Sequence, residues 1–310
     1  MMKFKQKKTG LNRLRRNDMI FYCTLVAIPL LHFILFYVVV NINSILLAFQ
    51  SIDKLTNQKT WTLETMKRAF TNLTQQPMMK MRFRNSVRMF FIVQIISEVF
   101  SLVFSFYIYK KYPGWSTFRV ILYIPSIVSG VVTMSIFRYF VDRAIPMIAA
   151  EWFGKQIEGF LSGPDFRFET LMFYNIFFSF GSTVLLYSNR MSGLSVDVLE
   201  AGQLDGVSGV KEFWYITFPH LYPLFSTFAI TSLVGIFTGE YNLFTFGTAV
   251  ATPELQTIGY WLFVQTYEAS LSSDAMFPIL AGTGMIITIV VAPATLLTRH
   301  LMEKYGPSED

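Results

Sequence analysis

The sequence of 310 residues contains very little cysteine and histidine. Its single cysteine, Cys23, can form no internal disulfide bond and cannot build a cysteine-based zinc site. The three histidines, His32, His220 and His300, lie far apart and in no HExxH or CxxC context. The sequence therefore carries no signature of a metal centre or of a disulfide-stabilised fold.

The motifs of common enzymes are also missing. There is no GxxxxGK[ST] phosphate-binding loop, because Gly154-Lys155 is followed by Gln156 and lacks the upstream glycine. No GxSxG elbow and no set of kinase motifs is present. We therefore expect that the chain is not an enzyme, and that an ion gradient or a partner protein drives any work on a solute.

Charged residues are scarce and apolar residues are abundant. The chain is 15% charged, 53% hydrophobic and 17% aromatic, with a mean hydropathy of +0.43, whereas soluble domains are about 25% charged. The net charge is +6, but seven of the 26 lysines and arginines lie between Lys3 and Arg16, directly before the first apolar run. That position is typical of a membrane-flanking segment rather than a nucleic-acid surface.

Six apolar runs are long enough to cross a hydrocarbon core as helices of about 20 residues. The first exceeds the ~7–15 residues of a signal-peptide core. We therefore predict an all-α integral membrane protein with six transmembrane helices, consisting of a basic tail (1–18), a membrane domain (19–298) and a second tail (299–310). The predicted spans are residues 19–40, 86–109, 120–141, 171–188, 224–246 and 277–297.

The basic N-terminal cluster places both termini in the cytoplasm, because the first helix usually sets the orientation. The outer loop of residues 41–85 is itself basic, which hints at an anionic solute. We expect a helix near residues 63–73 of that loop and a further short helix within residues 142–170.

The most informative segment is the inner loop between the fourth and fifth spans. Residues 196–204 are predicted to form a short helix that ends at the turn pair Asp205-Gly206. Ser208 then caps a second helix, which reaches about Phe218 and is ended by Pro219. On physical grounds alone, this segment could also be an amphipathic helix lying on the membrane, with aromatic side chains at the headgroups. These aromatics are Phe213, Trp214, Tyr215 and Phe218.

This loop, at about residues 189–223, resembles the EAA loop of the permeases of ABC importers. The family pattern begins with Glu-Ala-Ala, here Glu200-Ala201-Gly202. The glycine, isoleucine and proline that follow are matched by Gly206, Ile216 and Pro219. The longer sugar-importer version is matched by Asp205-Gly206, Phe213 and Pro223. The departures are Gly202 and Val207, where alanine is usual, and Ser195, where an Ile-Pro pair is common.

The resemblance covers most of the chain and is to permeases of maltose- and glycerol-phosphate-type importers. It implies a type I ABC importer permease fold in a bacterial inner membrane and the import of a sugar. The implied partners are a second homologous permease, an ATPase dimer and an extracytoplasmic solute-binding protein. The chain would hold no cofactor of its own, since ATP and Mg would bind the ATPase, and no nucleic acid is implied.

The resemblance also assigns roles within the loop. The first helix would dock into a cleft of an ATPase subunit, where Glu200 pairs with a basic residue. Ala201 and Gly202 would allow close approach, and Asp205-Gly206 would form the corner. Phe213 and Ile216 would anchor the second helix in the permease, although we favour simple packing as the explanation for both residues.

Polar residues within the spans suggest two further sites. Glu98 forms a stripe with Gln94, Ser101 and Ser105, for which we expect a helix-packing role. Similar permeases bind sugar between the spans that flank the EAA loop. By that resemblance, the candidates for the solute path are Phe178, Gly181, Glu240 and Tyr241, which combine aromatic faces with a hydrogen-bonding carboxylate.

Two other functions remain open at this point. An ion-coupled secondary carrier would use Glu98 or Glu240 as its coupling site, but such carriers usually have duplicated halves. A membrane-embedded scaffold would have no transport role. Dependence of uptake on ATP separates the importer from the carrier, and loss of uptake on deletion excludes the scaffold.

Overall fold

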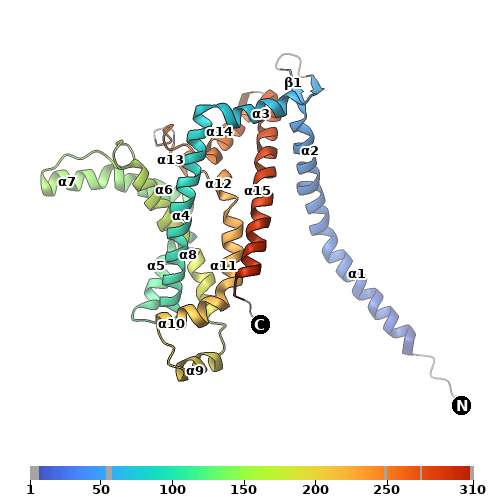
Figure 1. Cartoon of the computed structure of the whole chain (residues 1–310), viewed down its shortest axis with the longest axis vertical. Coiled ribbons are helices and arrows are strands. Elements are labelled where there is room, and N and C mark those ends of the chain that lie inside the picture. The colour runs from blue at the N-terminus through green and yellow to red at the C-terminus, as the bar shows by residue number, and fades with distance from the viewer. Residues whose placement is uncertain (1–6, 54–57, 248–249, 273, 308–310) are drawn as a thin grey trace. The chain divides into compact units, whose positions relative to one another are not determined.

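The computed structural model describes residues 7–53, 58–247, 250–272 and 274–307 (Figure 1). The chain divides into two compact units. The first comprises residues 1–70 and 273–285, and the second comprises residues 71–272 and 286–310.

The first unit begins with a continuous helix. It consists of α1 (Lys7–Phe33), the π-helical turn η1 (Ile34–Val38) and α2 (Val39–Ala48). Nearly every side chain from residue 18 to residue 46 is exposed, although the sequence there is strongly apolar. So long an exposed apolar surface is suited to contact with lipid or with another membrane helix.

A small hairpin and the starts of two helices complete this unit. Strands β1 (Gln50–Ile52) and β2 (Lys59–Trp61) pair antiparallel, with Ser51 opposite Thr60. The helix α3 (Glu64–Gln75) follows, and its buried Ala69 lies against Gly282 of α15 (Phe277–Tyr305). The 3-10 turn η4 (Asp274–Met276) precedes α15. The helix predicted near residues 63–73 is α3.

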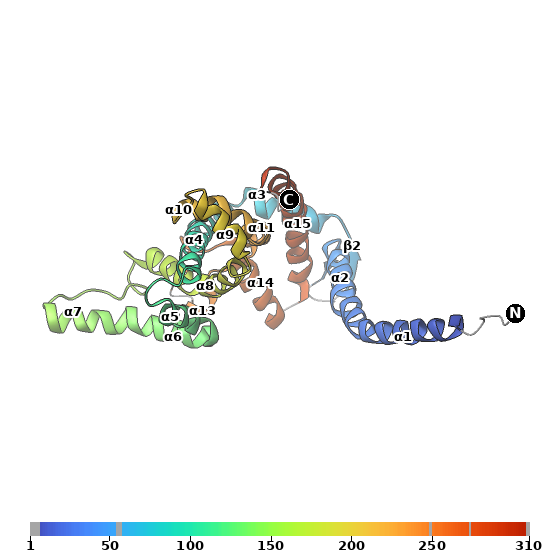
Figure 2. The ribbon, with the colours of Figure 1, turned by 90° about the horizontal axis from the view of Figure 1, so that it is seen from below.

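The second unit is a helical bundle in which α4, α8 and α11 lie side by side, while α9 lies beyond one end (Figures 1 and 2). We call this end the α9 end. The elements are α4 (Pro77–Tyr109), α5 (Trp115–Ile127), α6 (Gly130–Tyr139), the π-helical turn η2 (Phe140–Ala144), α7 (Ile145–Phe153), α8 (Arg167–Met191), α9 (Val196–Leu204), α10 (Val210–Glu212), the π-helical turn η3 (Phe213–Thr217), α11 (Phe218–Ser232), α12 (Gly235–Thr238), α13 (Leu243–Phe246), α14 (Ile258–Ser272) and the end of α15.

The contact between α4 and α8 uses small polar side chains as well as apolar ones. The Tyr187 hydroxyl donates a hydrogen bond to the Glu98 carboxylate, and the Ser105 hydroxyl donates to the Val184 carbonyl over 3.0 Å. Ser101 and Ser105 are buried. Hydrogen bonds of this kind and small residues are what hold helices together inside a membrane. The packing role predicted for Glu98 and these serines is confirmed.

Among the residues that the structure describes, five helices are long and apolar enough to cross a membrane, and a bent pair raises the number to six if it counts as one span. The five are Asp18–Ala48, Pro77–Tyr109, Arg167–Met191, Val210–Thr238 and Phe277–Tyr305. They contain or overlap five of the six predicted runs, so the predicted class of all-α membrane protein is confirmed.

The third predicted span, 120–141, is wrong as a straight helix. The chain bends by 104° between α5 and the helix Gly130–Phe153. Val128 and Ser129 are extended at the bend, with ψ values of 143° and 130°. Pro125 cannot donate a backbone hydrogen bond, which weakens the end of α5. Both arms are apolar, so hydropathy alone cannot reveal the break. The second arm ends in α7, the short helix predicted within 142–170.

The fifth predicted span, 224–246, has different limits. The helical stretch begins at Val210 and ends at Thr238. Beyond it, Tyr241 and Asn242 have positive φ values of 50° and 61°, which a continuing helix does not allow. The apolar residues of α13, which lie beyond this break, extended the hydropathy run past the true end of the helix.

Candidate functional site

The helix α9 spans Val196–Leu204, as the sequence predicts. Ser195 is its N-cap and accepts a hydrogen bond from the Asp197 N–H at 3.3 Å. Asp205 is its C-cap, and Gly206 turns the chain with φ +75°, a conformation that other residues rarely adopt. The turn predicted at Asp205-Gly206 is therefore confirmed.

One face of α9 is exposed. Glu200, Ala201 and Gln203 are exposed on it. Leu204 at the end of the helix is 89% exposed, and Val196 at its start is 64% exposed. Exposed leucine and valine beside an exposed carboxylate on a short, capped helix are typical of a protein-docking surface.

The opposite face of α9 rests on its own chain at Gly202. This glycine is buried, and a Cβ atom added to it would overlap the Cδ1 atom of Ile216. The Gly202 carbonyl also accepts a hydrogen bond of 2.8 Å from the Val207 N–H, which closes the corner. The glycine thus allows α9 to approach Ile216 within the same chain.

This contact gives a testable prediction. Gly202→Val is expected to speed hydrogen exchange in α9, because the tip of Ile216 can turn away from a single added methyl group but not from a branched side chain. Gly202→Ala is expected to slow exchange instead, because alanine favours a helix over glycine by about 1 kcal/mol. Exchange mass spectrometry measures both, with the exposed Gln203→Ala as a control. Slower exchange in Gly202→Val would contradict the steric argument.

The second helix of the loop differs from the prediction at both ends. Ser208 does not cap it, because the N-cap is Gly209 with φ +56° and no side-chain hydrogen bond. Pro219 does not end it, because α10, η3 and α11 form one helical stretch. The π-turn explains this tolerance: the Phe218 N–H bonds to the Phe213 carbonyl five residues back, and Pro219 follows in the first turn of α11.

Phe213 fastens this helix to α4. Its ring lies edge-on to Phe106, with centroids 5.2 Å apart. Both rings pack against a buried cluster of Tyr187, Met191 and Leu221 at the α9 end. Phe213 therefore takes part in the simple packing that we favour for it from the sequence.

An ion pair joins the same two helices, and sequence reasoning missed it. The Lys110 Nζ donates to both carboxylate oxygens of Glu212, over 3.0 and 2.9 Å. The Glu212 side chain is 5% exposed and that of Lys110 is 27% exposed. The partners are 102 residues apart in the sequence, so no local pattern links them.

An open cavity of about 480 Å³, whose lining mixes polar groups with a larger apolar surface, lies between α4 and the stretch from α11 to Tyr241. We call it the polar cavity after the groups in it that can hydrogen-bond. Its groups able to hydrogen-bond are the Gln94 amide, the hydroxyls of Thr231, Ser232 and Thr238, and the Tyr241 phenol. Burial raises the pKa of Tyr241 well above its usual value, so its hydroxyl stays protonated. The remaining lining residues are Phe90, Val93, Val234, Gly235 and Gly239.

Asn175 of α8 fixes the position of Tyr241. Its amide nitrogen donates to the Tyr241 carbonyl at 3.1 Å, and its amide oxygen accepts from the Asn242 side chain at 2.8 Å. These bonds hold the two residues with positive φ beside the cavity.

The other solute-path candidates lie elsewhere. Phe178 stacks on Tyr174 with centroids 4.4 Å apart, and Gly181 is buried against the Leu122 carbonyl of α5. The Glu240 carboxylate accepts a hydrogen bond from the Phe244 N–H at 3.2 Å. Only Tyr241 of the four lines the polar cavity, together with Gln94 from the predicted stripe.

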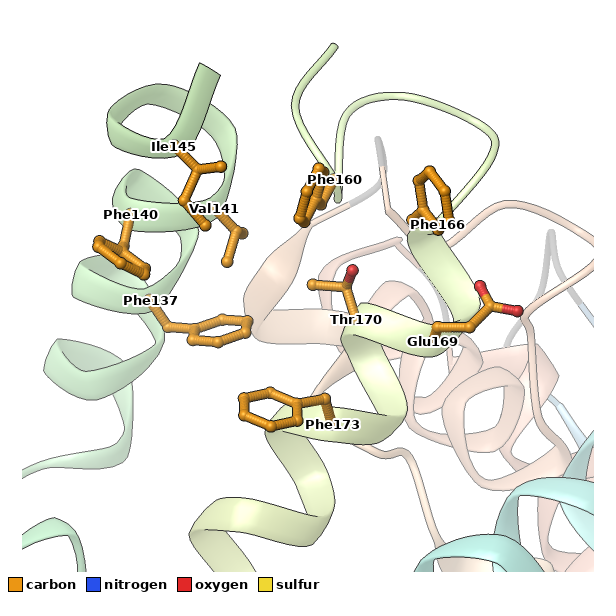
Figure 3. A pocket seen from close by; sticks show the side chains of 9 residues that line it. All are labelled: Phe137, Phe140, Val141, Ile145, Phe160, Phe166, Glu169, Thr170 and Phe173. Atoms are coloured by element: carbon orange, nitrogen blue, oxygen red, sulfur yellow. The ribbon is translucent and has the colours of Figure 1, made fainter. Parts of the chain in front are cut away.

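A second cavity, of about 400 Å³, is shown in Figure 3 and is almost entirely apolar. Its lining has only Glu169 and Thr170 as polar residues, so it offers little to bind a sugar hydroxyl. The other lining residues are Phe137, Phe140, Val141, Ile145, Phe160, Phe166 and Phe173.

No family model matches the chain. The chain is 26% identical over 199 residues to the probable ABC transporter permease protein YesP of Bacillus subtilis, and the matched residues make up 62% of each chain. This is somewhat less than two thirds of the length of YesP. It is also 25% identical over 237 residues to the lactose transport system permease protein LacF of Rhizobium radiobacter, covering 73% of this chain and 76% of LacF.

Solved structures of ABC transporters share the fold, among them two that concern alginate transport. One is a bacterial ABC transporter involved in the import of the acidic polysaccharide alginate, with a TM-score of 0.75, 17% identity and coverage of 96% of this chain and 99% of that one. The other is a bacterial alginate ABC transporter in complex with an alginate pentasaccharide-bound periplasmic protein, with a TM-score of 0.72, 16% identity and coverage of 93% and 96%. The predicted resemblance is therefore confirmed: the chain is similar in sequence to curated permeases of sugar ABC transporters, and it has the fold of an ABC importer permease.

Proposed function

We propose that the chain is the permease subunit of an ATP-driven importer and forms, with a second permease, the membrane path for a sugar or oligosaccharide. LacF is named for lactose transport, and one of the solved structures for alginate import. Both names support a carbohydrate as the solute.

The exposed face of α9 is the observation that carries this proposal. The helix is capped at both ends, presents Leu204, Val196 and Glu200 outward, and is joined at both sides to membrane-spanning helices. A rigid element of this kind can transmit the movement of a closing ATPase dimer to the helices of the bundle. In this role, Glu200 would form an ion pair with a basic residue of the ATPase, and the small side chain of Ala201 would let the ATPase approach α9 closely. Asp205-Gly206 would form the corner that ends the helix.

The remaining partners follow from this role. ATP and Mg would bind the ATPase subunits, and this chain would need no cofactor. A solute-binding protein would dock at the end of the bundle opposite α9. The solved complex of the alginate transporter with its periplasmic protein supports a partner of this kind. The basic residues between Lys3 and Arg16 favour an inner-membrane protein with cytoplasmic termini.

The polar cavity is the proposed solute path. Sugar hydroxyls both donate and accept hydrogen bonds, as do the Gln94 amide and the threonine and serine hydroxyls of the lining. The Tyr241 ring adds an apolar face of the kind that stacks on sugar rings. Phe178, Gly181 and Glu240 stay predictions for other parts of the path.

Uptake of radiolabelled lactose, maltotriose and an alginate trisaccharide by cells with the complete importer tests the function. We expect accumulation of at least one of them, and its loss when the partner ATPase is inactive. Accumulation that survives the inactive ATPase and stops with a protonophore would instead support the ion-coupled carrier.

Gln94→Leu tests the cavity. Removing both hydrogen-bonding groups of the amide is expected to raise the KM for uptake about tenfold, because each hydrogen bond contributes roughly 0.5–1.5 kcal/mol. The matched control is Ile95→Leu on the next, outward-facing position of α4. An unchanged KM in Gln94→Leu would remove this cavity from the solute path.

A further inference from the structure

The Lys110–Glu212 ion pair joins two helices that both continue to the polar cavity. Lys110 is the C-cap of α4, and α4 carries Phe90, Val93 and Gln94 into the cavity wall. Glu212 ends α10, and the stretch through η3 and α11 carries Thr231 and Ser232 into the opposite wall. The two walls are thus tied together at the α9 end.

The surroundings of the pair keep it rigid. The Phe106–Phe213 contact flanks it, and the Lys110 Nζ lies 6.0 Å from the centre of the Tyr109 ring. The carboxylate of Glu212 is buried, and both of its oxygens accept from one ammonium group. Charge-assisted bonds of this length are strong and directional.

Stability alone is a poor explanation for such a pair. Desolvating two charges costs free energy that their attraction only partly returns, so a neutral pair of similar volume is often equally stable. A geometric role accounts better for an ion pair at this position, because it fixes how α10 meets the end of α4.

We propose that Lys110 and Glu212 are positioning residues that transmit movement of the α9 loop to α4, and so to the cavity wall. This rests on the proposed function, since the movement begins with an ATPase docked on α9. Without the pair, the apolar contact of Phe213 with Phe106 would be the remaining link, so a smaller part of the movement of α9 and α10 would reach α4.

The complete importer is the system for the test, with Cys23→Ser and spin labels at Phe91→Cys and Val234→Cys beside the cavity. Both of these positions are exposed. Electron paramagnetic resonance reports the label separation before and after trapping with ATP and orthovanadate, so no transported solute is needed. The key variant is the neutral pair Lys110→Met with Glu212→Gln, which leaves no buried unpaired charge.

We expect the importer with the neutral pair to assemble with the ATPase and to hydrolyse ATP. On trapping, however, the change in its label separation is expected to fall below about one third of the wild-type change. The charge-reversed pair, Lys110→Glu with Glu212→Lys, is expected to recover most of it. The control removes the exposed pair Arg299–Glu303 and leaves the change intact.

The contradicting results are distinct for the two proposals. A full trapping-induced change in the assembled neutral pair would overturn the role of Lys110 and Glu212. Failure of the wild-type chain to assemble with any ATPase would contradict the proposed function itself.

Discussion

Leu204→Asp is expected to weaken binding of the ATPase subunits by about 100-fold and to abolish uptake. Leu204 is 89% exposed at the end of the proposed docking helix, and burying such a side chain against the ATPase would contribute about 1.5–3 kcal/mol. An aspartate there would also place an unpaired charge in the interface. Co-purification of the ATPase with the tagged permease measures the effect.

The control for this prediction is Leu271→Asp. Leu271 is 72% exposed near the end of α14, away from the α9 loop, so its variant is expected to retain the ATPase. Equal loss of the ATPase in both variants would point to a general effect of the charge. Full retention in Leu204→Asp would exclude Leu204 from the docking surface.

Gly181→Ala is expected to destabilise the bundle by about 3 kcal/mol, against the usual gain of up to about 1 kcal/mol for glycine to alanine inside a helix. Gly181 is buried in α8, and an added Cβ atom would overlap the backbone carbonyl of Leu122 in α5. A backbone carbonyl cannot swing aside as the tip of Ile216 can, so α5 and α8 must separate.

Thermal unfolding in detergent measures this change, with Gly130→Ala as the control. An added Cβ at Gly130 meets no atom within 4 Å among the residues described. We expect a clearly lower midpoint for Gly181→Ala and little change for Gly130→Ala. A midpoint at or above wild type for Gly181→Ala would show that α5 and α8 do not pack as the structure has them.

The features that the sequence predicts well are those set by local chemistry. The apolar runs mark the spans because a lipid core demands about 20 apolar residues. The end of α9 follows from the turn pair Asp205-Gly206, whereas the cap at Ser195 is seen only in the structure, since from the sequence this residue is only a departure from the family pattern. These preferences act over a few neighbouring residues, so distant contacts in the folded protein do not override them.

The features that could not be predicted depend on residues far apart or on hydrogen bonds that hydropathy does not register. The bend at Val128-Ser129 separates two helices that are both apolar, so the hydropathy does not mark it. Pro219 is tolerated because the π-turn before it shifts the hydrogen bonds. The Lys110–Glu212 pair and the cavity beside Gln94 arise only when α4 meets α10 and α11.

A photo-crosslinking residue at Gln203 tests the central claim most directly. Gln203 is exposed on α9 between Glu200 and Leu204, and Trp152, exposed at the end of α7, is the comparison site. In membranes that hold the complete importer, we predict that the probe at Gln203 crosslinks to the ATPase subunit and that the crosslinking yield changes when ATP is added. A probe at Trp152 is predicted to form no crosslink to the ATPase. Crosslinking of the Gln203 probe to lipid alone would place α9 on the membrane surface and contradict its role as the docking helix.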